Sequence, residues 1–320
     1  MPVDPQPAAL EIPADDVVVV FRTQKSNIRG RLVRLGATLD AAVAPHAMPD
    51  AASRPLSEAL ALAALCGSAI PKGGNLNLQT RSDGSVSILV ADYAASGRLR
   101  GYARYDAKKL ADERLRARRP GVGEVLGNGH LAITLDAGPG EERYQGVLAF
   151  EHAPLAATAA AYFEQREAMP TFIRVAVAEH FVGSRQAAPR APRWHRRAGG
   201  LMVQSTAVSL GDLGNVAGED WQRVKMLAAT VEDHELLDPE LPVERLLLRL
   251  FHEEAVAIER VIPLSHFCRC SREKVENVLR AFGAKELADM HDDKGQIVVT
   301  CEFCAARYTF LLADLEETGI

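Results

Sequence analysis

The sequence is poor in cysteine, with five in 320 residues, and four of these lie between positions 268 and 304. It has no run of about 20 apolar residues that would span a bilayer. Its first residues, MPVDPQPAALEIPADD, have neither the basic start nor the apolar core of a secretory signal. We therefore expect a cytoplasmic protein with no membrane partner. In that compartment, clustered thiols are reduced, and they more often bind metal or respond to oxidants than form structural disulfides.

An excess of positive charge is also missing, because the net charge is −5 and the isoelectric point is near 6.0. This balance gives no general attraction to nucleic acid or anionic lipid, so no nucleic-acid partner is expected. The composition, 48% hydrophobic and 25% charged, is that of a globular protein, and the length allows two or three domains. The proline-rich residues 1–16 are predicted to be a disordered leader.

Residues 17–214 are predicted to form one α+β core domain, with a mixed, mostly antiparallel sheet and packed helices. Alternating apolar and β-branched patterns predict its strands, and turn residues predict hairpins at 82–84 and 137–142. Helical spacing of apolar residues predicts helices over LSEALALAALCGSAI and LAATAAAYFEQREAM. The arginine-rich stretch from Gly183 to Gly200 is expected to be a long basic loop.

Residues 215–263 are predicted to be an amphipathic helical linker. Two apolar stripes run along it, one made of Trp221, Val224, Ala228 and Val231 and the other of Leu246, Leu247, Leu250 and Phe251. A helix this short is marginal in water on its own. The linker is therefore expected to rest its apolar faces on the α+β domain.

The last predicted unit, residues 264–312, carries nearly all the thiols and precedes a tail at 313–320. Its pattern is C-x-C followed by C-x-x-C, at Cys268, Cys270, Cys301 and Cys304. A helix capped by Ser271 and ended by Gly283 is expected to separate the two pairs, and a hairpin formed by QIVVT and RYTF is expected to bring them together. Four thiolates at one point fit a closed tetrahedral zinc site, so one zinc ion per chain is predicted.

The remaining candidates receive simpler interpretations. His266 and His291 are expected to be surface residues, because four sulfurs suffice for a metal. Cys66 lies on a small-residue helix and is expected to be a buried core thiol. No phosphate-binding glycine pattern, G-x-S-x-G or H-E-x-x-H is present, and the chain is not predicted to be an enzyme.

Two alternatives from other classes remain. A zinc-ribbon nucleic-acid binder would require a basic module with stacking aromatic residues, whereas this module mixes both signs of charge. A thiol–disulfide oxidoreductase would use CEFC, but that motif normally begins a helix, and here it follows a predicted strand.

Several stretches, taken in order, resemble the redox-regulated bacterial 33 kDa chaperonin (heat-shock protein 33) family. They are EVLGNGHLAITLD, EERYQGVLAF, AAYFEQREAMPT, AGGLMVQ, RLFHEEAV, FCRCS and CEFCAARYTF. The resemblance runs from about Val17 to about Leu312. The leader and the basic loop at 183–200 depart from the family's pattern.

This resemblance implies a stress-activated holdase that works without ATP. The reduced form would hold one zinc ion through the four cysteines and be inactive. Oxidation would form the disulfides Cys268–Cys270 and Cys301–Cys304, expel zinc, unfold the linker and favour a homodimer. The oxidised protein would then bind unfolding client proteins, and the candidate client-binding residues are those of the linker: Trp221, Leu246, Leu247, Leu250 and Phe251.

Overall fold

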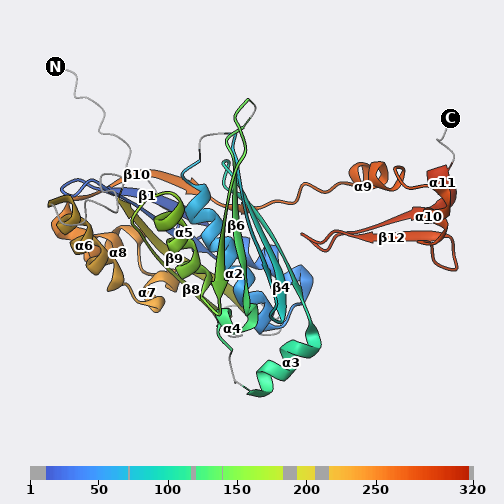
Figure 1. Ribbon diagram of the computed structural model, residues 1–320, viewed down its shortest axis with the longest axis horizontal. Helices are drawn as coiled ribbons and strands as arrows, with labels where there is room; N and C mark the ends of the chain where they lie inside the picture. The colour runs from blue at the N-terminus through green and yellow to red at the C-terminus, as the bar shows by residue number, and fades with distance from the viewer. Residues whose placement is uncertain are drawn as a thin grey trace.

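The computed structural model describes residues 12–70, 73–116, 120–138, 140–182, 193–205 and 216–316 (Figure 1). Its architecture is α+β, with two large sheets that are antiparallel except at one short strand, as the sequence predicts. Across these residues, no helix has the length and apolar character needed to cross a membrane. The boundary predicted near residue 214 lies outside the described residues, as do residues 1–11 of the leader.

The first sheet has five antiparallel strands in the order β10-β1-β2-β9-β8. They are β1 (Val17–Thr23), β2 (Ile28–Leu35), β8 (Thr171–Val182), β9 (Arg193–Ser205) and β10 (Val256–Pro263). Six of the seven residues of β1 are buried, because the sheet is covered on both faces. Strand β9 begins at Arg193, so the second half of the predicted basic loop is strand instead, and residues 183–192 lie outside the described part.

The second sheet has the order β11-β5-β4-β3-β6-β7. Its strands are β3 (Asn75–Ser82), β4 (Val86–Ala94), β5 (Arg98–Tyr105), β6 (Asn128–Asp136), β7 (Tyr144–Glu151) and the short β11 (Ser265–His266). Both predicted hairpins, β3–β4 and β6–β7, are confirmed. The pairing of β11 with β5 is parallel, and it attaches the start of the cysteine segment to the edge of this sheet.

Helix α2 (Asp50–Gly67) lies between the sheets and contacts strands of both (Figure 1). It is buried nearly all round, which suits its run of alanine and leucine. Gly67 allows the close approach, because a Cβ there would lie 2.3 Å from the ring of Tyr93. The shorter helices around this core are α1 (Ala37–Val43), η1 (Ala44–His46), α3 (Ala107–Arg116), α4 (Val122–Leu126) and α5 (Leu155–Arg166).

The linker helices pack on the other face of the first sheet. They are α6 (Val216–Ala229), α7 (Asp233–Leu237) and α8 (Val243–Phe251), and both predicted apolar stripes are buried there against β1, β2 and β9. Trp221 is 2% exposed and Phe251 is fully buried with its ring 5.5 Å from that of Phe21. Each such side chain contributes roughly 1.5–3 kcal/mol on burial. The expectation that the stripes rest on the α+β domain is therefore confirmed.

The prediction that the linker is helical to its end is wrong. After Phe251 the chain makes a short 3₁₀ turn, η3 (His252–Glu254), passes through Ala255 in the left-handed region at φ 52°, and becomes β10. The residues of β10, VAIERVIP, include four β-branched side chains, which favour a strand. They also pair with β1 along its full length, so the tertiary context outweighs local helical spacing.

The predicted disordered leader also needs correction, because its last residues are bonded to the core. Asp16 accepts hydrogen bonds from the backbone N–H groups of Gly36 and Thr38 at 3.0 and 3.1 Å. Asp15 forms a bidentate ion pair with Arg197. Short carboxylates placed at the start of α1 satisfy its unpaired N–H groups, and this orders residues 15 and 16.

A buried arginine, Arg34 of β2, fastens the linker through the linker's own backbone. The side chain is 0% exposed, and its guanidinium donates to the carbonyls of Leu241 at 2.5 Å and Glu235 at 3.0 Å. Arg197 of β9 donates to the carbonyl of Leu237 at 2.7 Å in the same way. The connection between α7 and α8 is therefore held by charge-assisted hydrogen bonds as well as by apolar contact.

Arg34→Met should loosen the linker selectively. The substitution keeps the length of the side chain but leaves two buried carbonyls without a donor, at a cost of roughly 1–3 kcal/mol each. Amide hydrogen exchange across 233–251 of the reduced protein should accelerate roughly 30-fold or more, since about 1.4 kcal/mol corresponds to a factor of ten. Arg29→Met, an exposed position on the same strand, is the matched control and should change nothing. Unchanged exchange in Arg34→Met would mean that apolar contacts alone hold the linker.

Candidate metal centre

The cysteine-bearing module is small and has its own core. It contains α9 (Arg272–Leu279), α10 (Ala284–Ala288), the hairpin β12 (Gln296–Thr300) and β13 (Arg307–Leu311), and α11 (Leu312–Glu316). Ser271 caps α9 by accepting from the backbone N–H of Lys274 at 3.2 Å, as predicted. The buried core consists of Leu279, Leu287, Ile297, Phe310 and Leu315.

Two expectations for this module differ from the structure. The helix that starts after Ser271 was expected to reach Gly283, but α9 ends at Leu279, and Val278 and Phe282 are exposed. The predicted tail at 313–320 contributes α11, whose Leu315 packs in the module's core, and residues 317–320 lie outside the described part. Half of the tail therefore belongs to the folded module.

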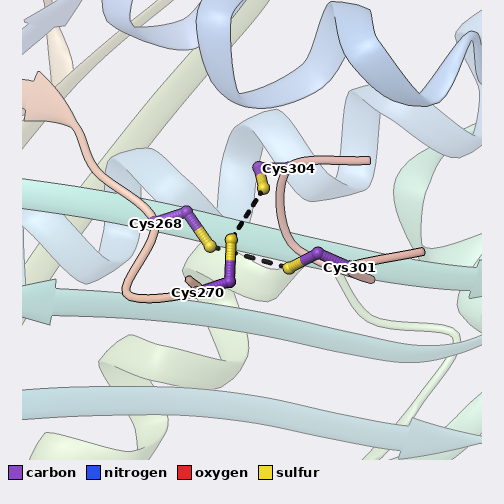
Figure 2. A group of neighbouring side chains, drawn as sticks. All are labelled: Cys268, Cys270, Cys301 and Cys304. Atoms are coloured by element: carbon purple, nitrogen blue, oxygen red, sulfur yellow. Dashed lines mark hydrogen bonds between the residues drawn. The ribbon is translucent and has the colours of Figure 1, made fainter. Parts of the chain in front are cut away.

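The hairpin and the segment after β11 bring all four cysteines together (Figure 2). Cys268 and Cys270 lie between β11 and α9, while Cys301 and Cys304 lie on the turn between β12 and β13. That turn closes through backbone hydrogen bonds between residue 301 and residues 305 and 306, both 2.9 Å long. Ala305, in the left-handed conformation at φ 55°, completes the turn.

The sulfur geometry suits a tetrahedral metal ion. All four Sγ atoms lie within 4.8 Å of one another. The separation is 3.6 Å between Cys268 and Cys301 and 3.4 Å between Cys270 and Cys304 (Figure 2). Tetrahedral zinc–sulfur bonds of about 2.3 Å place neighbouring sulfurs about 3.8 Å apart. The four side chains can therefore hold a metal ion with little movement, and they fill every position of a tetrahedron.

Cys268, Cys270 and Cys304 differ in acidity. Burial opposes ionisation of Cys270, but hydrogen bonds from Tyr308 Oη, at 3.1 Å, and from the neighbouring thiols outweigh it and lower the pKa of Cys270 to about 7. Burial raises the pKa of Cys268 and, more strongly, that of Cys304. Of these three thiols, Cys270 therefore ionises most readily, and thiolate is the form that binds metal and reacts with oxidants.

The two nearby histidines behave differently from each other. His291 is exposed, as expected. His266 is not the surface residue that was expected, because its Nε2 is buried without a hydrogen-bond partner among the described residues. Burial, together with the nearby His46, lowers the pKa of His266. Neither histidine belongs to the four-sulfur group.

The turn between Cys301 and Cys304 also touches the core domain, which sequence reasoning missed. The guanidinium of Arg100 lies 4.1 Å from the centre of the Phe303 ring, and Tyr102 lies 6.3 Å from it, ring to ring. His46 Nε2 lies 3.2 Å from the carbonyl oxygen of Phe303. The only signal in the sequence was the aromatic residue inside the C-x-x-C pattern. The site is thus anchored on β5 both by β11 and by Phe303.

The fifth cysteine takes no part in the site. Cys66 lies on α2 at 5% exposure, and burial raises its pKa to about 12. Its predicted place in the core is confirmed. The candidate client-binding residues, Trp221, Leu246, Leu247, Leu250 and Phe251, form a separate group that is buried on the first sheet.

Comparisons with known proteins agree with this arrangement. The family model described as "Hsp33 protein" matches residues 16–311. The 33 kDa chaperonin of Caulobacter vibrioides (strain NA1000 / CB15N) is 41% identical over 295 residues, which are 92% of this chain and 94% of that protein. That of Nitrosococcus oceani is 33% identical over 297 residues, covering 93% and 92%. The crystal structure of a 33 kDa chaperonin from Thermotoga maritima superposes with a TM-score of 0.74 at 23% identity, covering 94% of this chain and 97% of that one.

These similarities identify both the fold and the family of this chain. The match to the solved structure shows that this chain has the fold of that 33 kDa chaperonin. The family model and the relatives cover nearly the whole chain. The chain therefore belongs to the Hsp33 family.

Cys301→Ser should remove most of the metal bound to the reduced protein. Three thiolates bind far less tightly than a closed set of four. Elemental analysis of the purified reduced protein, as metal per chain, measures the effect. Cys66→Ser is the control and should bind as much metal as the unmodified chain. Stoichiometric metal in Cys301→Ser would exclude that residue as a ligand.

Proposed function

We propose that this protein is a redox-regulated chaperone that works without ATP and holds unfolding proteins when it is oxidised. Family membership supports a chaperone role. The observation that carries the redox part is the position of the thiol cluster: the chain runs from the docked linker through β10 and β11 directly to Cys268. Any change at the cluster therefore acts on the segment that ends the linker.

The metal of the reduced state is proposed to be zinc, held by Cys268, Cys270, Cys301 and Cys304. When bound, it would keep the four sulfurs as thiolates and tie the two cysteine pairs together. An all-sulfur set favours zinc among the common metals of the cell. In this state the linker stays docked and the apolar faces of both linker and sheet are covered, so the protein is inactive.

Oxidation is proposed to form the disulfides Cys268–Cys270 and Cys301–Cys304. Each bond forms when two thiolates give two electrons to an oxidant such as hypochlorous acid or peroxide, and four thiolates are then no longer available as ligands. In the folded site the shortest sulfur contacts join the two pairs crosswise. Partners one or two residues apart nevertheless stay close when the module opens, whereas the crosswise partners are separated by a flexible loop of about thirty residues, and this entropy favours the local pairs.

Loss of the metal-held module is proposed to release the linker. The module's core of five buried residues is small for independent folding. Without it, β10 and the helices before it lose their anchor at the C-terminal end. Trp221, Leu246, Leu247, Leu250 and Phe251 would then be exposed together with the sheet face beneath them, and apolar surface of this kind binds unfolding clients and favours a homodimer.

The proposed setting is cytoplasmic and the proposed role is not enzymatic. Cys301 and Cys304 lie on the turn of a β-hairpin, whereas an oxidoreductase C-x-x-C begins a helix. The module mixes Arg and Lys with Asp and Glu, which does not favour a nucleic-acid surface. These features support the chaperone over both alternatives.

The test compares reduced and oxidised protein in suppressing the aggregation of a thermally unfolding client, with released zinc measured in parallel. The oxidised form should suppress aggregation at near-stoichiometric ratio and release about one zinc per chain, while the reduced form should do neither. Disulfide mapping of the same oxidised sample should show the two local pairs. Equal suppression by both forms would refute redox control, and a dominant Cys270–Cys304 bond would refute the pairing.

A further inference from the structure

We propose that the oxidised protein captures clients by strand addition, with an extended client segment pairing along β1 in the place that β10 leaves. This inference rests on the proposed function, because it requires the linker to detach. It goes beyond that function by assigning a sheet edge as the binding site. It also assigns the kind of client segment that this edge binds, namely an extended segment with apolar β-branched residues.

One continuous piece of chain covers the edges of both sheets in the reduced fold. Strand β10 pairs antiparallel with β1, from Val17 opposite Pro263 to Thr23 opposite Val256. The next residues continue along β5, where the backbone N–H of Ser265 donates to Gly97 at 2.9 Å and that of Phe267 donates to Leu99 at 3.0 Å. Cys268 follows at once, so the cover over both edges ends at the thiol cluster.

The edge of β1 that β10 covers could pair with another strand if β10 were absent. Strand β1 is followed in the sheet order by β2 on one side and β10 on the other. Removing β10 would leave a row of N–H and C=O groups along seven residues of a buried, valine-rich strand, and such an edge is a template for pairing. Strand addition satisfies those groups, and unfolding proteins supply extended segments.

Strand β10 has no fully buried residue, although Arg260 donates to the carbonyl of Ser68 at 2.6 Å and Ile262 packs against the main core. All of its residues are half-buried or exposed, in contrast to the buried residues of β1. Glu259 interrupts the register between the pairs Val20–Arg260 and Phe21–Ile258, which makes it the extra residue of a bulge. A strand whose side chains are only partly buried makes fewer demands on its sequence than a fully buried strand, which suits a site that must accept many clients.

The side chains of β10 show what an occupant of this edge should carry. Val256, Ile258 and Val261 pack at the rim of the apolar cluster that the linker helices share with the sheet. Opposite them in the register stand Thr23, Phe21 and Val19. After the linker leaves, a client strand with apolar side chains at these positions would both pair with β1 and cover part of the exposed face. An amphipathic helix could cover the face but could not satisfy the edge.

The probe is a fluorescently labelled peptide with the sequence of residues 256–262, VAIERVI, added to the full-length protein. It should bind the oxidised form and should not bind the reduced form, where β10 occupies the edge. The matched control is the same peptide N-methylated at every backbone amide. The control keeps all side chains and gains apolar surface but loses every N–H donor, so its affinity for the oxidised protein should be roughly tenfold or more lower.

A second measurement locates the site. Oxidation should remove hydrogen-exchange protection from those β1 amides that face β10, while the amides that face β2 stay protected. Adding the unmethylated peptide should restore the lost protection. If β1 is instead reprotected without peptide, in step with concentration-dependent dimerisation, the occupant of the edge is a second copy of this chain and the assignment to clients is overturned.

The outcomes separate this inference from the function on which it rests. Strand addition is refuted if the oxidised protein suppresses aggregation while its β1 amides remain protected. It is also refuted if that protein binds the N-methylated peptide as tightly as the parent peptide. Either result leaves the chaperone proposal intact. Peptide binding at β1 without suppression of aggregation refutes the chaperone proposal but leaves intact the assignment of β1 as a strand-binding edge. Absence of both refutes both.

Discussion

The meeting of four sulfurs from two distant parts of the chain is the constraint on which the rest of the structure depends. Two helices, α9 and α10, and the hairpin strand β12 separate Cys268 and Cys270 from Cys301 and Cys304. Thiols attract one another weakly, whereas zinc bound in such modules contributes roughly 10–16 kcal/mol of energy that is also folding energy. The module, with five buried core residues, therefore gains its stability from whatever holds the sulfurs together.

The influence of that site reaches the core domain through backbone contacts as well as side chains. Strand β11 pairs with β5, and the ring of Phe303 lies over Arg100 of the same strand. Strand β10 continues the connection along β1, and Arg34 and Arg197 reach from the first sheet to the carbonyls of the linker. These donors find the linker carbonyls only while the linker is docked. The docked linker is therefore held along its length by a continuous series of contacts from the first sheet to the thiol cluster.

Local patterns in the sequence predicted most of the strands, the two hairpins and the grouping of the cysteines. Hairpins depend on turn residues and alternation, and the cysteine pairs are close in sequence, so local information suffices for them. Strand β10 was mistaken for helix because its identity comes from pairing with β1, more than 230 residues earlier in the chain. The four β-branched residues of β10 were the only local sign of a strand.

The missed side chains have the same explanation. Arg34 is one arginine among many in the sequence, and only the fold shows that it is fully buried beneath the linker. Phe303 and His266 owe their surroundings to β5 and to α1 with its following turn. Contacts between distant segments could therefore not be predicted from the periodicity of the sequence, whereas the spacing of the cysteines predicted the thiol cluster.

The fluorescence of Trp221 is the most direct test of the dependence of the linker on the thiol cluster. The chain has two tryptophans, so a Trp194→Phe variant reports on Trp221 alone, which is 2% exposed on α6. During oxidation its emission should shift to the red at the same rate as zinc is released, and the shift should reverse when reductant and zinc are restored. Zinc release with unchanged emission, in a protein that suppresses aggregation, would contradict the account.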